Sequence, residues 1–430
     1  MNSQFRFLHT ADLHLDSPLK SLARRDLALA EHVANATRSA FENIVDLCIQ
    51  EEMHALLLAG DIYDTQNPSV ATVGFFLRQL NRLKDTDTHV YMIRGNHDHY
   101  SKLVNTVQLP SHVTEFHGKK KSETLKEHGV VIHGVSFKEE HATESALRDF
   151  KAPNEKFRNI ALLHTSLGGS EGHDIYAPCS ITELDSMGFD YWALGHIHKR
   201  QVAGDVSKIV MPGTPQGRDM GESGAKTVTL VTLNGHDCEI EERTVSPVQF
   251  ERITVDLTDL DEHNGLQSDT LKRFTESFVK QVNSIKNESP HIERWIFRVT
   301  CQADAETLFT LKSDSEHTED AIRLAAEPLL NVHLDKIHYR LLDGTSASSK
   351  TDHSLLTQLS DVVMEHLDDE QLAAMANEEF DALIKFLPTK SLRDELQGTT
   401  ETRQNTIRTL QIEGIKELLS MIQIDRAKES

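Results

Sequence analysis

Cysteine is scarce in this sequence, and its four residues stand far apart, at positions 48, 179, 238 and 301. Because no two of them form a C-x-x-C pair, the pattern argues against a disulfide framework and against a zinc ribbon. Long apolar runs are also missing, since no stretch approaches the ~18 consecutive apolar residues that a membrane helix needs. The first residues lack the charged and apolar regions of a signal peptide. We therefore expect a cytoplasmic protein that does not enter a membrane.

Basic residues are outnumbered, because 45 Lys and Arg stand against 67 Asp and Glu, for a net charge of -22. A protein that binds DNA by itself usually presents a basic face. The acidic balance indicates either that nucleic acid is not the substrate or that positive charge is supplied locally. Bound divalent metals and a partner subunit are two such sources.

The first 245 residues or so alternate short apolar runs with amphipathic segments. Six of the runs are expected to be buried strands: FRFLH (5–9), ALLLAGD (55–61), HVYMIRG (89–95), VVIHGV (130–135), IALLH (160–164) and YWALGH (191–196). Between the first two strands the spacing predicts a helix, with Ser39 and Glu42 as its capping box. Strands that alternate with helices predict an α/β domain with its chemistry at the carboxyl ends of the strands.

The pattern changes after Pro247, and a chain of 430 residues is long enough for two or three domains. Strand-like RITVDL, a helix over 270–282, strand-like RWIFRVT, a helix over 319–330 and strand-like HLDKIHYRLL predict a small α+β domain at 248–343. The small-residue segment at 344–352 is expected to be a flexible linker. A helical region follows at 353–430, and its last helix, from Ile407 to Ile422, suits either a partner or its own small bundle.

Polar side chains follow five of the apolar runs. They are Asp12 and His14 in ADLHLD, Asp61 and Asp64 in AGDIYD, Asn96, His97 and Asp98 in RGNHD, His164 in LLHTS, and His196 and His198 in LGHIH. Each motif alone is weak, because a single histidine at a strand end is usually a hydrogen-bonded surface residue. All five in this order, each beside an apolar strand, are a strong signal.

These residue types suit a centre with two metal ions. Two cations about 3.5–4 Å apart need a bridging carboxylate, and mixed nitrogen and oxygen ligands suit Mn, Fe or Zn. Residues at i and i+2 of a strand end point the same way, so Asp12 with His14, and His196 with His198, can present two ligands together. Glycines at 60, 95 and 195 would let backbone and metals approach closely.

The set D-x-H, G-D-x-x-D, G-N-H-D, H and G-H-x-H resembles the calcineurin-like metallophosphoesterases. Within them it most resembles the SbcD-type DNA repair exonucleases, in the YhaO-like branch, through ADLHLDSP and the MPGTPQGR segment at 211–218. The resemblance implies a β-sandwich flanked by helices over 1–247, which is the catalytic domain. It further implies that the α+β domain at 248–343 caps the site and that part of 353–430 docks on an ATPase.

The same resemblance implies a role for each motif residue. Asp12, His14 and His198 would hold one metal, Asn96, His164 and His196 the other, and Asp61 would bridge both. His97 would stabilise charge or protonate the leaving oxygen, with Asp98 orienting it. Asp64 departs from the histidine that archaeal and eukaryotic members carry, so its role stays open. Arg94 and Arg218 could face phosphates or be solvated.

The expected function is therefore metal-dependent phosphodiester hydrolysis of DNA by a metal-activated water, with two divalent ions, Mn first and Fe or Zn as alternatives. The resemblance implies an SbcC-like coiled-coil ABC-type ATPase as partner, and a homodimer is an open alternative. Two rival functions remain at this point. One is a nucleotide or small-molecule phosphatase, and the other is a non-catalytic scaffold of a DNA-repair ATPase complex.

Overall fold

The computed structural model describes residues 4–17, 33, 35–65, 67–98, 106–118, 121–136, 145–150, 153–168, 176–257, 267–341, 370–385, 403–404, 406–411 and 414. Its contacts divide the chain into two compact units. The first unit comprises Met1–Ile253, Val282–Arg298 and Ala326–Lys336, and the second comprises Thr254–Gln281, Val299–Ala325 and Ile337–Ser430. The predicted domain boundaries at 247 and 343 stay predictions.

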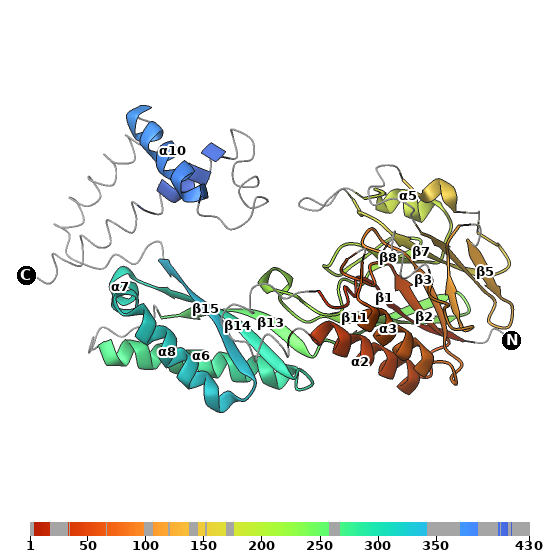
Figure 1. Ribbon diagram of the computed structural model, residues 1–430, viewed down its shortest axis with the longest axis horizontal. Helices are drawn as coiled ribbons and strands as arrows, with labels where there is room; N and C mark the ends of the chain where they lie inside the picture. Colours follow the sequence, from red (N-terminus) through yellow and green to blue (C-terminus); the bar gives the residue numbers. More distant parts are fainter. Residues whose placement is uncertain are drawn as a thin grey trace, which may run out of the picture. The chain divides into compact units, whose positions relative to one another are not determined.

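Two six-stranded sheets dominate the first unit (Figure 1). One has the order β12-β11-β1-β2-β3-β4, with β1 at Phe5–Thr10, β2 at Ala55–Ala59, β3 at His89–Ile93, β4 at Val113–Glu115, β11 at Thr227–Asn234 and β12 at Asp237–Thr244. The other has the order β5-β6-β7-β8-β10-β9, with β5 at Ser122–Leu125, β6 at Val130–Val135, β7 at Arg158–His164, β8 at Tyr191–Gly195, β9 at Gln201–Ala203 and β10 at Lys208–Met211. All six predicted strands are present.

The two sheets form a sandwich because their strands are apolar on both faces. Phe7 and Leu57 of one sheet share a buried cluster with Ile132 and Leu162 of the other. The alternate residues of β1 and β2 point the opposite way, into a cluster beneath α2 (Ala36–Gln50) and α3 (Val70–Arg82). A strand buried on both faces reads as a continuous apolar run, which is what made these segments recognisable.

Helices cover the outer faces of the sandwich. The predicted start of one of them, α2, is wrong. The α2 helix begins at Ala36, so Ser39 lies inside it and does not cap it. Ala36 and Ala40 are buried, and packing of the extra turn therefore decides where the helix starts. A genuine capping box stands at α5 (Ile181–Ser186), which covers the second sheet, where Ser180 and Glu183 bond reciprocally. The short 3-10 helices are η1 at Leu147–Asp149 and η2 at Met220–Glu222.

The strands and helices predicted for the next segment are present, and its status as a separate domain stays a prediction. A three-stranded sheet has the order β13-β14-β15, with β13 at Val248–Asp256, β14 at Arg294–Ala303 and β15 at Val332–Leu341. Its helices are α6 at Gln267–Glu288, α7 at Ala305–Ser313 and α8 at Ser315–Ala326, followed by η3 at Glu327–Leu329. Phe274, Phe278 and Val282 of α6 are fully buried, and their spacing of four residues places them on one helix face.

The helical prediction for the C-terminal region is met by α10 at Glu370–Lys385, where Phe380 and Ile384 pack with Ile407. This contact favours packing within a small bundle for Ile407. The linker at 344–352, the helix expected near 355–367 and the residues from 415 onward lie outside the described residues.

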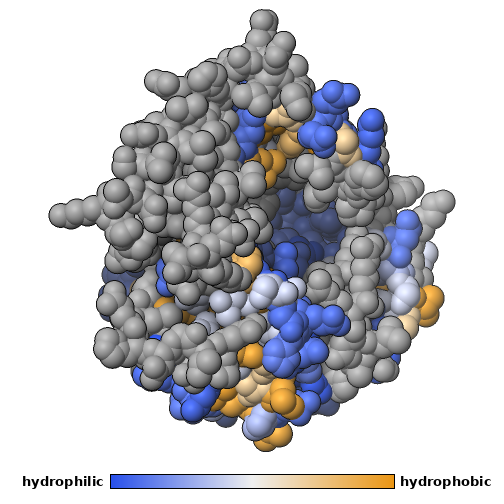
Figure 2. All heavy atoms as spheres, turned by 90° about the vertical axis from the view of Figure 1, so that its left-hand side faces the viewer, coloured by the Kyte–Doolittle hydropathy of each residue, from blue (hydrophilic) through white to orange (hydrophobic). Residues whose placement is uncertain are grey.

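Figure 2 shows hydrophobic residues scattered among hydrophilic ones on the face in view, within the described part of the chain.

Within that part, none of the helices combines the length and the apolar character that a membrane span requires.

Candidate metal centre

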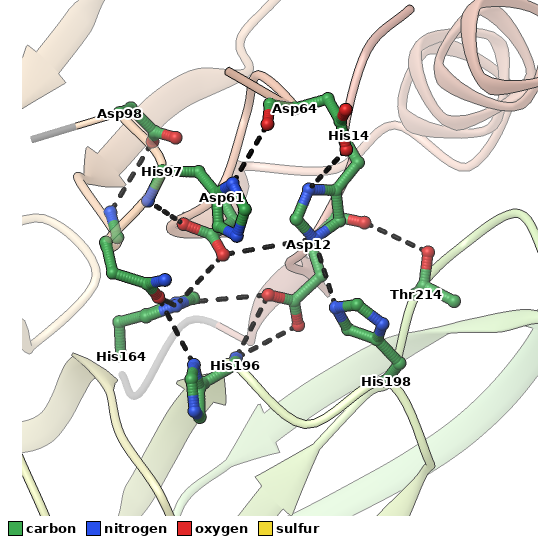
Figure 3. Close-up of polar contacts among 12 residues, drawn as sticks. Asp12, His14, Asp61, Asp64, His97, Asp98, His164, His196, His198 and Thr214 are labelled. Carbon is green, nitrogen blue, oxygen red and sulfur yellow. Dashed lines mark hydrogen bonds and ion pairs between the residues drawn. The ribbon is translucent and has the colours of Figure 1, made fainter. Parts of the chain in front are cut away.

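The five motifs meet at one edge of the sandwich. Strands β1, β2 and β3 are parallel neighbours in one sheet, and β7 and β8 are parallel neighbours in the other. Their carboxyl ends therefore face the same way, and the loops that follow them carry the motif residues. Figure 3 shows these side chains pointing toward one another around Asp12 and Asp61.

The backbone of these loops is strained where it presents the side chains. The φ angles of Asp12, His14, Asp61 and His196 are 54°, 41°, 50° and 106°, in the left-handed region that favours glycine. Such conformations cost about 1–3 kcal/mol each and gather at functional sites. The Asp12 amide donates to the Gly60 carbonyl at 3.0 Å, and the His14 amide donates to the Asp61 carbonyl at 3.1 Å. These bonds fix the loop after β1 against the loop after β2.

Glycine is required at two of these strand ends. Gly60 has a φ of 91°, and a Cβ there would lie 2.5 Å from Nδ1 of His164. A Cβ on Gly95 would overlap the Asp61 carboxylate. Both positions therefore let the loops approach closely enough to bring the carboxylates and imidazoles together.

One group of donors consists of Asp12, His14 and His198. Each offers a ligand atom, and these atoms all lie within 4.8 Å of one another. The Nε2 atoms of His14 and His198 are 3.0 Å apart. Asp12 is fully buried, and both of its carboxylate oxygens accept the His196 amide at 3.0 Å. This carboxylate therefore also fixes the loop that carries both later histidines.

The other group consists of Asn96, His164 and His196. Oδ1 of Asn96 lies 3.0 Å from Nε2 of His164 and 3.3 Å from Nδ1 of His196. Oδ2 of Asp61 lies 3.3 Å from Nε2 of His164 and 3.9 Å from Nε2 of His14. Asp61 thus reaches both groups through the same oxygen, Oδ2.

The donor set fits two cations. Nδ1 of His164 donates to the Ala59 carbonyl at 2.9 Å, so in the neutral ring Nε2 carries only a lone pair. That lone pair faces two oxygens that also accept, from Asn96 and Asp61. Acceptors that converge in a buried site need a positive charge between them. Carboxylate, amide and imidazole donors are those that Mn, Fe and Zn take.

The pKa values express the same demand for positive charge. Burial lowers the pKa of His164, but the Asp61 carboxylate overrides it and raises that pKa to about 9. Burial would raise the pKa of Asp61, yet His164 holds it well below its usual range. Burial raises the pKa of Asp12 to about 6. The raised pKa of His164 thus reflects the negative charge of the Asp61 carboxylate beside it.

His97 lies beside this centre and is partly exposed. Its amide donates to Oδ1 of Asp61 at 3.0 Å, and its Nδ1 lies 2.9 Å from the Asp64 carbonyl. The expected role of Asp98 in orienting this ring stays a prediction, and no direct hydrogen bond between the two side chains is among those of the described residues. Oδ2 of Asp98 instead accepts the amides of Ile62, at 3.2 Å, and Gly95, at 3.4 Å. Asp98 therefore organises the loop backbone, and the Asp64 carbonyl orients His97.

The two arginines proposed for phosphate contact are engaged with carboxylates. Arg94 is buried and pairs with Glu115. Arg218 pairs with Glu222 at 2.7 Å and with Asp64 at 3.3 Å. Oδ1 of Asp64 lies 3.6 Å from Nδ1 of His14, so Asp64 stands behind a ligand candidate.

Three residues of the site were not predicted from the sequence. Glu222 lies 2.7 Å from Nδ1 of His198, and the Thr214 hydroxyl donates to the Asp12 carbonyl at 3.0 Å. Tyr176 stacks on His196 with ring centroids 5.6 Å apart. The MPGTPQGR segment contains Thr214 and ends four residues before Glu222, so it was the one available signal.

Comparison with known proteins agrees with this geometry. Residues 5–200 match the family model described as calcineurin-like phosphoesterase. The metallophosphoesterase YhaO of Bacillus subtilis is 33% identical over 264 residues, which are 60% of this chain and 65% of YhaO. The DNA double-strand break repair protein Mre11 of Sulfurisphaera tokodaii is 26% identical, over 54% of this chain and 61% of that protein. A component of the nuclease SbcCD of Escherichia coli is 25% identical, over 56% of this chain and 68% of that component. The chain thus spans about two thirds of the length of these relatives.

Proposed function

Because residues 5–200 form a calcineurin-like phosphoesterase domain, we propose that this protein is a two-metal phosphodiesterase that hydrolyses DNA. The observation that carries the proposal is the convergence of donors from five loops around Asp61, with lone pairs facing lone pairs. Asp12, His14 and His198 would hold one ion, Asn96, His164 and His196 the other, and Asp61 would bridge them. When bound, such ions activate water and stabilise the charge of a phosphodiester during in-line attack.

His97 is the residue of this chain best placed to act on the substrate. With Nδ1 held by the Asp64 carbonyl, Nε2 is the nitrogen available for a leaving oxygen or a charged phosphoryl oxygen. The hydrogen bond from its amide to Asp61 keeps the ring beside the proposed bridging carboxylate. His97 would therefore donate a proton to the leaving oxygen, while Asp64 and Asp61 fix its position.

The choice of DNA rests on relatives that are named as part of a nuclease and as a double-strand break repair protein. A net charge of -22 opposes DNA binding by this chain alone, so positive charge must come from elsewhere. Two cations held by the seven proposed ligands would supply part of it near the scissile phosphate. We propose that an SbcC-like coiled-coil ABC-type ATPase supplies the rest by holding the DNA, and that part of 353–430 docks on it.

A comparison of three substrates tests the proposal. The full chain, loaded with Mn²⁺, is given linear DNA, a nitrophenyl phosphodiester and a nitrophenyl phosphomonoester. We expect metal-dependent hydrolysis of both diesters and little turnover of the monoester, with DNA hydrolysed more slowly than the small diester because the ATPase that would hold it is absent. Preference for the monoester would establish a phosphatase, and turnover of none of them by metal-loaded protein would establish a non-catalytic scaffold.

A further inference from the structure

The two halves of the metal centre are supported in different ways. The His164 ring is held by the backbone, because its Nδ1 donates to the Ala59 carbonyl. The His196 ring stacks on the ring of Tyr176. Both supports are uncharged and buried. His198 is supported instead by the Glu222 carboxylate, and its side chain is 20% exposed.

Close contacts between polar side chains form a closed ring through the half that contains His198, and the ion pairs in it are those of Arg218 with Glu222 and Asp64. Oε1 of Glu222 lies 2.7 Å from Nδ1 of His198 and 2.7 Å from Nη2 of Arg218. Nη1 of the same guanidinium lies 3.3 Å from Oδ1 of Asp64, which is 3.6 Å from Nδ1 of His14. The Nε2 atoms of His14 and His198, 3.0 Å apart, close the ring.

The chemistry of the ring fixes the tautomer of His198. A carboxylate oxygen can only accept, so the 2.7 Å contact with Glu222 requires the proton on Nδ1. Nε2 then presents its lone pair toward His14 and Asp12. Nη2 of Arg218 also lies 2.9 Å from Nδ1, but a guanidinium can only donate, and it does so to the Oε1 atom that both share. Arg218 therefore orients the carboxylate that orients the imidazole.

We propose that Glu222, held by Arg218, is a positioning residue for only one of the two metal ions, the one assigned to Asp12, His14 and His198. This inference rests on the metal assignment of the proposed function. A carboxylate behind a ligating histidine fixes the ring and raises its basicity, and its loss costs about 10–100-fold in metal affinity. The ion assigned to Asn96, His164 and His196 is supported through the Ala59 carbonyl and the Tyr176 ring, so it keeps its affinity when Glu222 is changed.

The planar fork of Arg218 suits it to this role. It meets Glu222 through Nε and Nη2 and reaches Asp64 through Nη1, so one side chain contacts both carboxylates. A lysine has one point of charge and cannot span both carboxylates. Because Arg218 acts through Glu222, the effects of removing both residues are expected to be less than additive.

The test is a titration of metal-free protein with Mn²⁺ by calorimetry, with native mass spectrometry to count ions. In the parent we expect two ions per chain. In Glu222→Ala we expect the Mn²⁺ affinity of the site assigned to Asp12, His14 and His198 to fall by about 10–100-fold, and that of the other site to stay unchanged. In Glu222→Gln the affinity of the first site should lie between the values of the parent and of Glu222→Ala, because the amide oxygen still accepts a hydrogen bond. Circular dichroism shows whether each variant is folded, and Glu222→Gln, of equal size, serves if the alanine variant is not.

A matched control separates this role from general loss of an ion pair. Asp335 pairs with Arg298 in the third sheet, and the two side chains are 12% and 20% exposed, close to the 14% and 21% of Glu222 and Arg218. Asp335→Asn should leave both Mn²⁺ affinities unchanged. Equal loss at both sites in Glu222→Ala, or no loss at either, would overturn the inference. A parent that binds no Mn²⁺ pair would overturn the metal assignment itself.

Discussion

The two compact units differ in what they bury. The first buries Asp12, Asp61, Asp98 and His164 within the loops at one edge of its sandwich. Among the described residues of the second unit, the buried polar side chains are two threonines, Thr307 and Thr318. Unpaired buried charge is costly, so the first unit accepts it only where a cation can neutralise it. The second unit follows the ordinary rule for a core, and its residues should matter for stability and not for chemistry.

The largest expected effect comes from the buried charge itself. Asp61→Asn and His196→Ala should each abolish hydrolysis and reduce bound metal, because one removes the proposed bridge and the other a proposed ligand. Metal content by mass spectrometry and turnover of the nitrophenyl diester are the measurements. Normal metal content with full activity in either variant would contradict the dinuclear assignment.

Removal of His97 should separate chemistry from metal binding in the same loops. His97→Ala should keep both metals and lower turnover of DNA by about 10²–10⁴-fold, the usual contribution of a positioned acid. A nitrophenyl diester has a good leaving group that needs little protonation, so its loss should be much smaller. Equal losses on both substrates would refute the role of proton donor.

A core substitution in the second unit should give the opposite result. Phe278 is fully buried, and Phe278→Ala should lower the free energy of unfolding by about 3–5 kcal/mol. Hydrolysis of the nitrophenyl diester should persist, since every proposed ligand lies in the first unit. Urea unfolding followed by circular dichroism measures the first effect. Lys272→Ala, at a side chain that is 69% exposed on the same helix, is the control and should change stability by less than about 0.5 kcal/mol. A Phe278→Ala protein that is folded yet inactive would break the comparison.

The smallest expected effect is on the reactivity of two buried cysteine thiols. Because each unit contains one of them, their alkylation reports on the two units separately. Burial raises the pKa of Cys179 in the first unit to about 11 and that of Cys301 in the second to about 12. The thiolate is the reactive form, so both thiols should react slowly near pH 7.5 and faster as the pH rises. In Phe278→Ala, Cys301 should become reactive at lower urea than Cys179. Mass spectrometry of alkylated peptides measures the reaction of each thiol at each urea concentration. If Cys179 and Cys301 become reactive at the same urea concentration, the two units unfold together.

The sequence predicted the parts of the molecule that local patterns encode. The six apolar runs are strands because they are buried on both faces, and the polar residues after them converge because parallel strands end at one edge. Six further strands of the two sheets were not predicted. The edge strands β4, β5, β9 and β12 consist of half-exposed and exposed residues and carry no apolar run. The interior strands β10 and β11 are mostly buried and were missed as well.

The support behind the ligands could not be predicted from the sequence. Glu222 lies 24 positions from His198, and only the folded loop after β10 brings the two together. The motif places Asp98 next to His97, whereas the Asp64 carbonyl, 33 positions away, holds the ring. Every residue carries a backbone carbonyl, so a sequence motif does not show which carbonyl accepts a hydrogen bond. Contacts of this kind can be identified only once the fold is known.

The most direct measurement is anomalous scattering at the manganese edge from crystals of the protein grown with Mn²⁺. The account predicts two peaks about 3.5–4 Å apart, the usual spacing of a two-metal site, with the Asp61 carboxylate between them. One peak should lie among Asp12, His14 and His198, and the other among Asn96, His164 and His196. A single peak, or two peaks that Asp61 does not join, would contradict the two-metal centre on which the proposed hydrolysis of DNA depends.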